Sequence, residues 1–281
     1  MRDKCILPFL ITERLEFFQL TQADLPELEI LLGDPEIMYA WEHGFTKIES
    51  QAWLNENLRR YSSDGYSYWA VRKKNDGSLI GVMGILKEVA EGKQYIGIGY
   101  ILNKKYWGQG YEGTAALCQY AFRKLQLQTL TAQVRTNNFA SQHIAEGLGM
   151  KAMCNFVKIY RGQEMPHFLY TLDRDKWLKT ASNGTVIMLE LEVKKDFLQL
   201  LLLGDEDEKM LDRYLKRGDL FALYKGDLKA TVVVTQEKED VFEVKNLAVW
   251  PQEQRSGYGR FLMTEMCRLY SRLGTRMLVG T

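Results

Sequence analysis

Apolar and polar positions change period along the chain, and each change marks the edge of a predicted element. Alternating or short apolar runs, which favour strands, occur at residues 14–20, 66–72, 79–86, 95–102, 130–134, 151–160 and 168–172. Apolar residues three and four positions apart, which favour helices, follow Thr21, Thr46, Gly110 and Asn138. The pattern mixes strands and helices throughout, so the sequence predicts an α/β (α+β) fold.

Short sequence motifs locate the starts of two helices and the turn of one hairpin. Thr21 with Asp24 and Thr46 with Glu49 have the spacing of capping boxes, in which two side chains satisfy the free amides of a helix start. Asn75-Asp76-Gly77 separates two predicted strands, and an Asp-Gly step favours the positive φ angles of a tight hairpin. We therefore expect helices to begin at both boxes and a turn at Gly77.

The second half of the chain repeats the order of elements of the first. Strands are predicted at residues 186–192, 220–224, 228–234, 242–249 and 276–280, and helices at 197–203, at 208–215 and after 254–259. Aligning Gly110 with Gly257 places a strand, a glycine-containing turn and a helix in the same order in both halves. We expect a first domain over residues 1–178, a polar linker over 179–184 and a second, related domain over 185–281.

Composition excludes several classes of protein. Hydrophobic residues make up 46% of the 281 positions and charged residues 26%, which is typical of a globular chain. The net charge of +1 gives no general field for nucleic acid or an anionic membrane, so neither partner is expected. The run Cys5–Ile11 is too short to span a bilayer. Four cysteines without a C-x-x-C pair predict reduced, mostly buried thiols in a cytoplasmic protein, and no metal site is expected.

A glycine-rich turn, Gly108-Gln109-Gly110, follows a predicted strand and opens a helix. The first amides of a helix have no intrahelical partner, and the helix dipole is positive there, so the turn could bind a phosphate. A tight connection without a ligand is an equally plausible interpretation. The chain contains no G-x-x-x-x-G-K-[ST] motif, and neither glycine turn completes G-x-G-x-x-G, so a nucleotide P-loop and a dinucleotide fold are not predicted.

Residues 12–177 resemble an N-acetyltransferase of the GNAT superfamily, of the ribosomal-protein (Rim) type. The stretches that carry the resemblance, in order, are Thr12–Leu15, Asp34–Met38, Gly99–Leu102, Tyr106–Tyr111 and Arg135–Met150. The resemblance implies a GNAT-like acyl-CoA N-acyltransferase fold, in which helices flank a twisted mixed sheet that splits beside the glycine turn.

The resemblance also implies acetyl-CoA as the cofactor, lying in this split. Its pyrophosphate would meet the amides of Gln109–Tyr111, and its pantetheine arm would run along a strand edge. The residues expected to bind it are Ile101, Leu102, Trp107, Gly108, Gln109, Gly110, Tyr111, Asn138 and Ser141. Glu112 departs from the family pattern, which usually has a small residue there, and its carboxylate could repel a pyrophosphate unless it points away.

Catalysis is expected around Asn138-Phe139-Ala140-Ser141, which matches an N-x-x-S segment of the family. The resemblance implies that Asn138 binds the pantetheine arm and that Ser141 stabilises or protonates the leaving thiolate; the alternative is a helix cap with an inert serine. The general base stays open. The family position falls near Tyr160, whose phenol is a poor base at neutral pH. The other candidates are Glu42, His43, Glu164, His167 and a water relay.

Residues 185–281 resemble the front part of a second GNAT domain. The signature is Lys245–Val249 followed by Gln254–Gly259, which fits the pattern [QR]-x-x-G-x-[GA]. A cofactor there would meet Leu247, Val249, Gln254, Gly257 and Gly259. Because such a domain normally continues with the asparagine-bearing helix and two more strands, we expect this incomplete half not to be an independent enzyme. Its last strand, 276–280, would leave a sheet edge to be covered.

The sequence therefore predicts transfer of an acetyl group from acetyl-CoA to a primary amine, within a ternary complex. The acceptor could be a protein N-terminus or a small amine, and Tyr39, Trp41, Glu42 and Phe45 are expected to line its site; core packing is the alternative for the three aromatic residues. The alternative function is a CoA-binding or structural interaction module without catalysis. A homodimer is possible.

Overall fold

The computed structural model describes residues 7–180, 184–190 and 194–280, and it forms two compact units. Unit 1 comprises Met1–Pro8 and Thr12–Gly184, and unit 2 comprises Phe9–Ile11 and Thr185–Thr281. The short strand β1 (Leu10–Ile11) belongs to unit 2 because it pairs with β9 (Val186–Glu190). This departs from the predicted first domain of residues 1–178. Residues 181–183 of the predicted linker lie outside the described residues.

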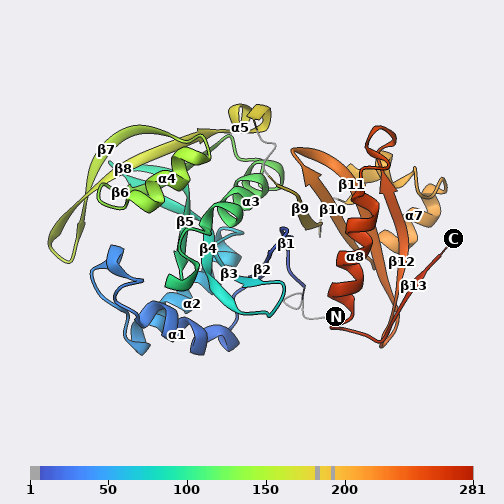
Figure 1. The fold of residues 1–281 in the computed structure, drawn as a ribbon, viewed down its shortest axis with the longest axis horizontal. Helices are drawn as coiled ribbons and strands as arrows, with labels where there is room; N and C mark the ends of the chain where they lie inside the picture. Colours follow the sequence, from blue (N-terminus) through green and yellow to red (C-terminus); the bar gives the residue numbers. More distant parts are fainter. Residues whose placement is uncertain (1–6, 181–183, 191–193, 281) are drawn as a thin grey trace. The chain divides into compact units, whose positions relative to one another are not determined.

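Unit 1 is built on one twisted mixed sheet with the strand order β2-β3-β4-β5-β6-β8-β7 (Figure 1). Neighbouring strands are antiparallel except for β5 and β6, which are parallel. The strands are β2 (Leu15–Gln19), β3 (Tyr68–Lys73), β4 (Leu79–Ala90), β5 (Lys93–Leu102), β6 (Thr129–Arg135), β7 (Lys151–Tyr160) and β8 (Gln163–Asp173). The helices are α1 (Leu25–Gly33), α2 (Lys47–Ser63), α3 (Gly110–Arg123), α4 (Phe139–Gly147) and α5 (Arg174–Thr180).

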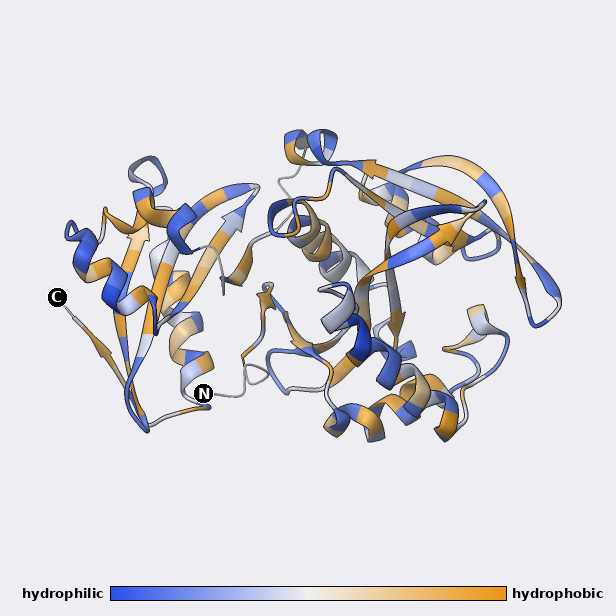
Figure 2. Cartoon of the chain, turned by 180° about the vertical axis from the view of Figure 1, so that it is seen from behind, coloured by the Kyte–Doolittle hydropathy of each residue, from blue (hydrophilic) through white to orange (hydrophobic). Residues whose placement is uncertain are grey.

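Alternation along the strands gives this sheet two apolar faces. Val82 and Leu86 of β4 pack into a core that also contains Leu28 and Leu32 of α1 and Leu54 of α2. The intervening positions face α3: a side chain at Gly113 would meet the sulfur of Met83, and Trp69 contacts Tyr120 edge-on at 5.7 Å. Figure 2 shows the apolar residues along the strands, whereas the helices alternate between apolar and polar positions. Helices therefore cover both faces of the sheet.

The local signals in the sequence are confirmed at three places. Both predicted capping boxes are formed, Thr21 with Asp24 and Thr46 with Glu49. Gly77 adopts a φ of 69°, as the hairpin turn requires.

Helix α5 was not predicted, because its sequence, RDKWLKT, has almost no apolar periodicity. It is anchored by a single buried side chain, Trp177, whose ring lies 6.4 Å from that of Phe122. Tertiary packing of one large residue therefore decides this element.

Unit 2 is a smaller sheet with the order β13-β12-β11-β10-β9-β1. Its remaining strands are β10 (Asp219–Lys225), β11 (Asp227–Lys238), β12 (Val241–Val249) and β13 (Arg276–Val279), and its helices are α6 (Leu198–Leu201), α7 (Glu208–Leu215) and α8 (Tyr258–Tyr270). Only β12 and β13 are parallel among the strand pairs described here. Helix α8 buries Leu262, Met266 and Tyr270. Leu278 and Val279 of β13 are about half exposed.

The prediction that the cysteines are mostly buried is wrong for the described residues. Cys118 is buried in α3, whereas Cys154 and Cys267 are free and exposed. Cys5 lies outside the described residues. None of the described helices combines the length and the apolar character needed to cross a membrane.

Gly84 tests the packing of the central strands. A Cβ atom there would lie 2.6 Å from the carbonyl oxygen of Ser67 and from Cα of Tyr68, and backbone cannot move aside easily. We expect Gly84→Ala to lower the free energy of unfolding by about 1–3 kcal/mol. The control is Gly33→Ala, whose nearest neighbour would be 3.6 Å away. Thermal unfolding of both variants measures the difference, and equal losses would show that the clash at Gly84 is not the cause.

Candidate active site

The sheet of unit 1 opens between its two parallel strands. β5 and β6 pair only at Gly97 and Thr131, whereas β5 stays paired with β4 as far as Leu102. One edge of residues 98–102 is therefore free of a neighbouring strand within the described part of the chain. Two adjoining cavities lie at this split, and they share Trp41, Tyr100 and Ser141.

The first cavity, which we call the turn cavity, lies beside the glycine turn and has a volume of about 200 Å³. It brings together most of the residues that the sequence predicted as cofactor ligands. They are Ile101, Leu102, Trp107, Gly108, Gly110, Asn138 and Ser141, joined by the predicted acceptor-site residues Tyr39 and Trp41. Gln109 and Tyr111 do not line it, and the Tyr111 hydroxyl instead donates to the carbonyl of Gly147, at 3.2 Å.

The glycine turn is shaped by close packing as well as by conformation. Gly108 has a φ of 80°, and a Cβ atom on Gly110 would lie 3.1 Å from both Ile144 and Leu102. The amide of Gln109 donates to the carbonyl of Tyr106, at 3.0 Å. The prediction that this amide is available to a pyrophosphate is therefore wrong, and the first amides of α3 remain as the candidates.

Glu112, on the first turn of α3, forms hydrogen bonds and an ion pair with residues that precede β2. Its carboxylate accepts from the Thr12 hydroxyl at 2.6 Å, from the Arg14 amide at 3.0 Å and from Arg14 Nε at 2.5 Å. The guanidinium offsets the negative charge beside the turn. Glu112 thus does not stand as a free carboxylate at the predicted phosphate site.

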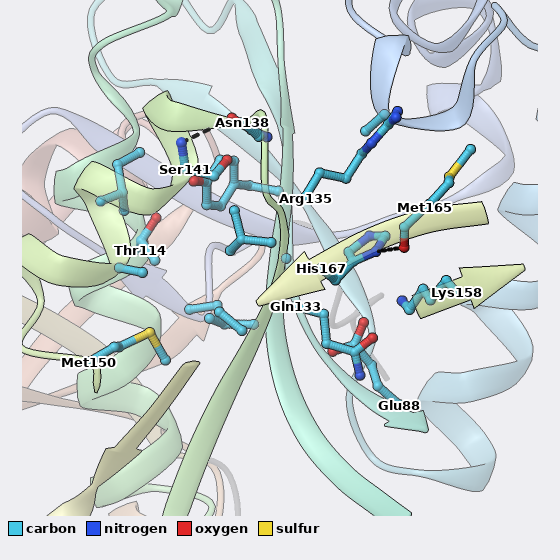
Figure 3. A pocket seen from close by; sticks show the side chains of 18 of the residues that line it. Glu88, Thr114, Gln133, Arg135, Asn138, Ser141, Met150, Lys158, Met165 and His167 are labelled. Carbon is cyan, nitrogen blue, oxygen red and sulfur yellow. Dashed lines mark hydrogen bonds between the residues drawn. The ribbon is translucent and has the colours of Figure 1, made fainter. Parts of the chain in front are cut away.

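Asn138 and Ser141 form the start of α4. Asn138 Oδ1 accepts from the amide of Ser141 at 3.1 Å, so Asn138 caps the helix, and both side chains also line the two cavities (Figure 3). Burial raises the pKa of Tyr100 to about 12, an effect that a hydrogen bond with Ser141 partly offsets. The Tyr100 phenol therefore stays protonated at neutral pH and can support the Ser141 hydroxyl.

The second cavity, which we call the inner cavity, continues from Ser141 between β4, β6, β7 and β8 and has a volume of about 240 Å³. Its polar side chains converge from several strands and from helices α3 and α4 (Figure 3). They are Tyr68, Glu88, Tyr100, Thr114, Gln133, Arg135, Asn138, Ser141, Lys158, Tyr160 and His167. Two of the residues predicted as candidate bases, Tyr160 and His167, are therefore in the cavity, whereas Glu42, His43 and Glu164 do not line it.

Glu88 enters this cavity because Gly97 makes room for its carboxylate, as Gly99 does for the hydroxyl of Tyr68. A Cβ atom on Gly97 would collide with Oε2 of Glu88, and one on Gly99 would lie 2.6 Å from the Tyr68 hydroxyl. Oε2 is buried without a hydrogen-bond partner in the described structure, and burial raises the pKa of Glu88. Glu88 was not among the predicted site residues; the glycine at position 97 of the neighbouring strand is the sequence signal that could have identified it.

His167 is a buried, neutral imidazole. Its Nδ1 lies 2.7 Å from the carbonyl oxygen of Met165, and because a carbonyl only accepts, Nδ1 carries the proton. Burial lowers its pKa, which keeps the ring neutral at pH 7 and leaves Nε2 as an acceptor.

An ion pair between Arg135 of β6 and Glu42 holds the loop over residues 39–45 against the sheet. Arg135 Nη1 donates to the Tyr39 carbonyl at 3.2 Å and to Glu42 Oε1 at 2.5 Å. Glu42 has a φ of 64°, a strained angle for this residue type. Glu42 therefore holds the loop and does not line a cavity, and Phe45 packs against the core of α1 and α2.

Unit 2 carries a comparable turn. Val249, Gln254, Gly257 and Gly259 line a surface hollow of about 370 Å³, and Gly257 has a φ of 86°. The fifth predicted residue, Leu247, does not line it. β12 and β13 pair in parallel from Val241 and Arg276 to Val244 and Val279.

Three comparisons with known proteins bear on unit 1. The family model of the acetyltransferase (GNAT) domain matches residues 14–151. The uncharacterized protein YkkB of Bacillus subtilis is 30% identical over 164 residues, which is 57% of this chain and 93% of that protein. The crystal structure of a GNAT-family acetyltransferase from Bacillus anthracis covers 59% of this chain and 99% of its own, with 22% identity and a TM-score of 0.52. The crystal structure of the ribosomal-protein-S5-alanine acetyltransferase from Vibrio fischeri covers 59% of this chain and 97% of its own, with 18% identity and a TM-score of 0.50.

Hydrogen–deuterium exchange can test whether the Arg135–Glu42 ion pair holds the loop over residues 39–45. Arg135→Gln removes the charge that binds Glu42 and the Tyr39 carbonyl, so we expect amide exchange across residues 39–45 to rise severalfold. The control is Arg59→Gln, which breaks an exposed ion pair with Glu56 within α2. Unchanged exchange in the loop of Arg135→Gln would show that this ion pair does not hold it.

Proposed function

This chain belongs to the GNAT acetyltransferase family, and from that premise we propose that unit 1 transfers an acetyl group from acetyl-CoA to a primary amine. The family and the mixed, helix-flanked sheet predicted from the sequence are both confirmed. The observation that carries the proposal is the arrangement of the split. A free strand edge, a glycine turn and Ser141 lie on one side, and the Glu88 carboxylate, whose Oε2 is buried without a hydrogen-bond partner in the described structure, lies on the other.

The turn cavity fits the donor. A pantetheine arm carries amides that can pair with the free edge of residues 98–102 in the manner of an added strand. The start of α3 offers unpaired amides and the positive end of the helix dipole to a pyrophosphate. The amide nitrogen of Asn138, whose oxygen caps α4, can donate to the arm. Acetyl-CoA bound in this way would supply the activated acetyl group.

Glu88 is the proposed proton acceptor. An amine must lose a proton before or during its attack on a thioester, and a carboxylate with a raised pKa is a stronger base than an ordinary one. Glu88 meets this need because its pKa is raised by burial and its Oε2 has no other partner in the described structure. It can take the proton directly or through one water molecule. Neutral His167, across the same cavity, is the second candidate.

Ser141 is the proposed donor to the leaving sulfur. Its hydroxyl lies where the two cavities meet, and both cavities are also lined by the Tyr100 phenol, which its raised pKa keeps protonated. A hydrogen bond or proton from Ser141 would stabilise the thiolate as the acetyl group leaves. Asn138 positions Ser141 through the cap of α4.

Calorimetric titration and a serine variant test the donor site. We expect the protein to bind acetyl-CoA, and Ser141→Ala to lower kcat about 100-fold while changing the affinity for acetyl-CoA less than threefold. Ser63→Ala, at the exposed end of α2, is the control. An absence of binding at millimolar acetyl-CoA would refute the donor site. An unchanged kcat would remove Ser141 from the mechanism.

A glutamate variant tests the base. Because only the ionised carboxylate accepts a proton, kcat/KM should rise with pH through the raised pKa of Glu88, at higher pH than for an ordinary glutamate. Glu88→Gln should lower kcat at least 100-fold and abolish this rise. Glu91→Gln, in the β4–β5 turn, should behave like the wild type. If Glu88→Gln keeps the rise, another group such as His167 is the base.

The pH dependence of thermal stability provides a second test of Glu88→Gln. Since the pKa of Glu88 is higher in the folded than in the unfolded state, ionisation destabilises the fold as pH rises above the unfolded value. Glu88→Gln should therefore melt at a higher temperature than the wild type at pH 7, and the difference should shrink toward pH 4. A less stable but active variant would indicate a purely structural glutamate.

A further inference from the structure

The inner cavity contains one unpaired charge of each sign, and we propose that it selects a free α-amino acid as the acceptor. The amine would lie at Glu88 and the carboxylate at Lys158, which makes Lys158 a specificity-determining residue. This inference rests on the proposed function and adds the class of substrate to it.

Lys158 is a half-buried cation without a counterion. Lys158 and Tyr160 lie two positions apart on β7, and both side chains line the inner cavity. The alternate residues of this strand, Val157 and Ile159, point the other way and are exposed. The ammonium of Lys158 makes no hydrogen bond or ion pair in the described structure, and its nearest recorded partner is the Phe156 ring, at 6.0 Å. An ammonium withdrawn partly from water gains most from an anionic ligand.

Glu88 and Lys158 face the same space without closing on each other. The positive charge of Lys158 lowers the pKa of Glu88, against the larger effect of burial, so the two groups are electrostatically coupled. They nevertheless form no ion pair. Figure 3 shows both side chains at the same side of the cavity, beside Gln133. A zwitterion whose amine and carboxylate are separated by one carbon would pair with both at once.

The other charges of the cavity do not supply this selectivity. Arg135 is engaged by Glu42 and by the carbonyl of Tyr39, and His167 is neutral. Glu88 is the one acidic residue among those that line the cavity in the described structure. A polyamine would therefore meet a single carboxylate and two cations, and a simple amine would leave Lys158 unpaired.

The rest of the wall indicates the side chain of the amino acid. Apolar and aromatic groups surround the charged pair, and the volume of about 240 Å³ suits a small ligand. They include Trp41, Ile98, Leu148, Met150 and Met165. We expect an apolar amino acid such as methionine, leucine or phenylalanine.

The reaction balances without any further reactant. The ammonium of the amino acid gives a proton to Glu88, and its nitrogen forms a C–N bond with the acetyl carbonyl carbon. The C–S bond of acetyl-CoA breaks, and the nitrogen loses a second proton as the amide forms. The sulfur leaves as a thiolate that receives this second proton through the Ser141 hydroxyl, and Glu88 releases the first proton to water. The products are the N-acetyl amino acid and CoA, and the α-carboxylate stays ionised at Lys158 throughout.

The test compares each amino acid with its own carboxamide, which keeps the amine and the side chain and removes the negative charge. We expect kcat/KM to be at least tenfold higher for L-methionine, L-leucine or L-phenylalanine than for the matching carboxamide. Lys158→Gln should reduce this preference below threefold by raising KM for the acids. It should change the carboxamide values by a much smaller factor than the values for the acids. Lys151→Gln, at the exposed start of β7, is the control and should keep the preference.

Each other outcome has a definite meaning. If the wild type acetylates carboxamides, spermidine or peptides as well as the free amino acids, the inference is wrong and the proposed function stands. If Lys158→Gln slows acids and carboxamides equally, Lys158 acts only on Glu88 and the inference is again wrong. If acetyl-CoA binds but no amine of any class is acetylated, the proposed function itself fails.

Discussion

The parting of β5 from β6 after Gly97 is the constraint on which the site of unit 1 depends. Parallel strands that stayed paired would bury the edge of residues 98–102 and leave no space beside Ser141. The separation is maintained from both sides. β5 remains paired with β4, and β6 pairs with β8 along its whole length. The cleft is therefore a property of the rigid sheet, and the loops only complete its walls.

Two glycines in β5 extend this opening toward β4. Without Cβ atoms at Gly97 and Gly99, the Glu88 carboxylate and the Tyr68 hydroxyl can lie against the strand. The space comes at a thermodynamic cost, because a carboxylate oxygen without a partner is buried there. A fold selected for stability alone would pair or replace such a group, so its presence is consistent with a chemical role.

Periodic patterns predicted the sheet, and local motifs predicted the turn and the start of α4, because both signals reside in neighbouring residues. Groups that act across strands were harder to see. Glu88 was missed because its significance depends on Gly97, which only pairing brings beside it. The amide of Gln109 was assigned to a phosphate because its bond to Tyr106 depends on the exact course of the turn. The pairing of β1 with β9 joins segments far apart in sequence, which no local pattern records.

The two units share one part of their architecture and differ in another. Both have a parallel strand pair, a turn with a glycine in the left-handed region and a helix behind it. In unit 1, Asn138, Ser141, Lys158 and His167 come from α4, β7 and β8, the elements that follow β6. β13 of unit 2, the counterpart of β6, ends at Val279, next to the last described residue. Within the described chain, unit 2 thus has the glycine turn, whereas unit 1 has both the turn and the side chains to which we assign the proposed acetyl transfer.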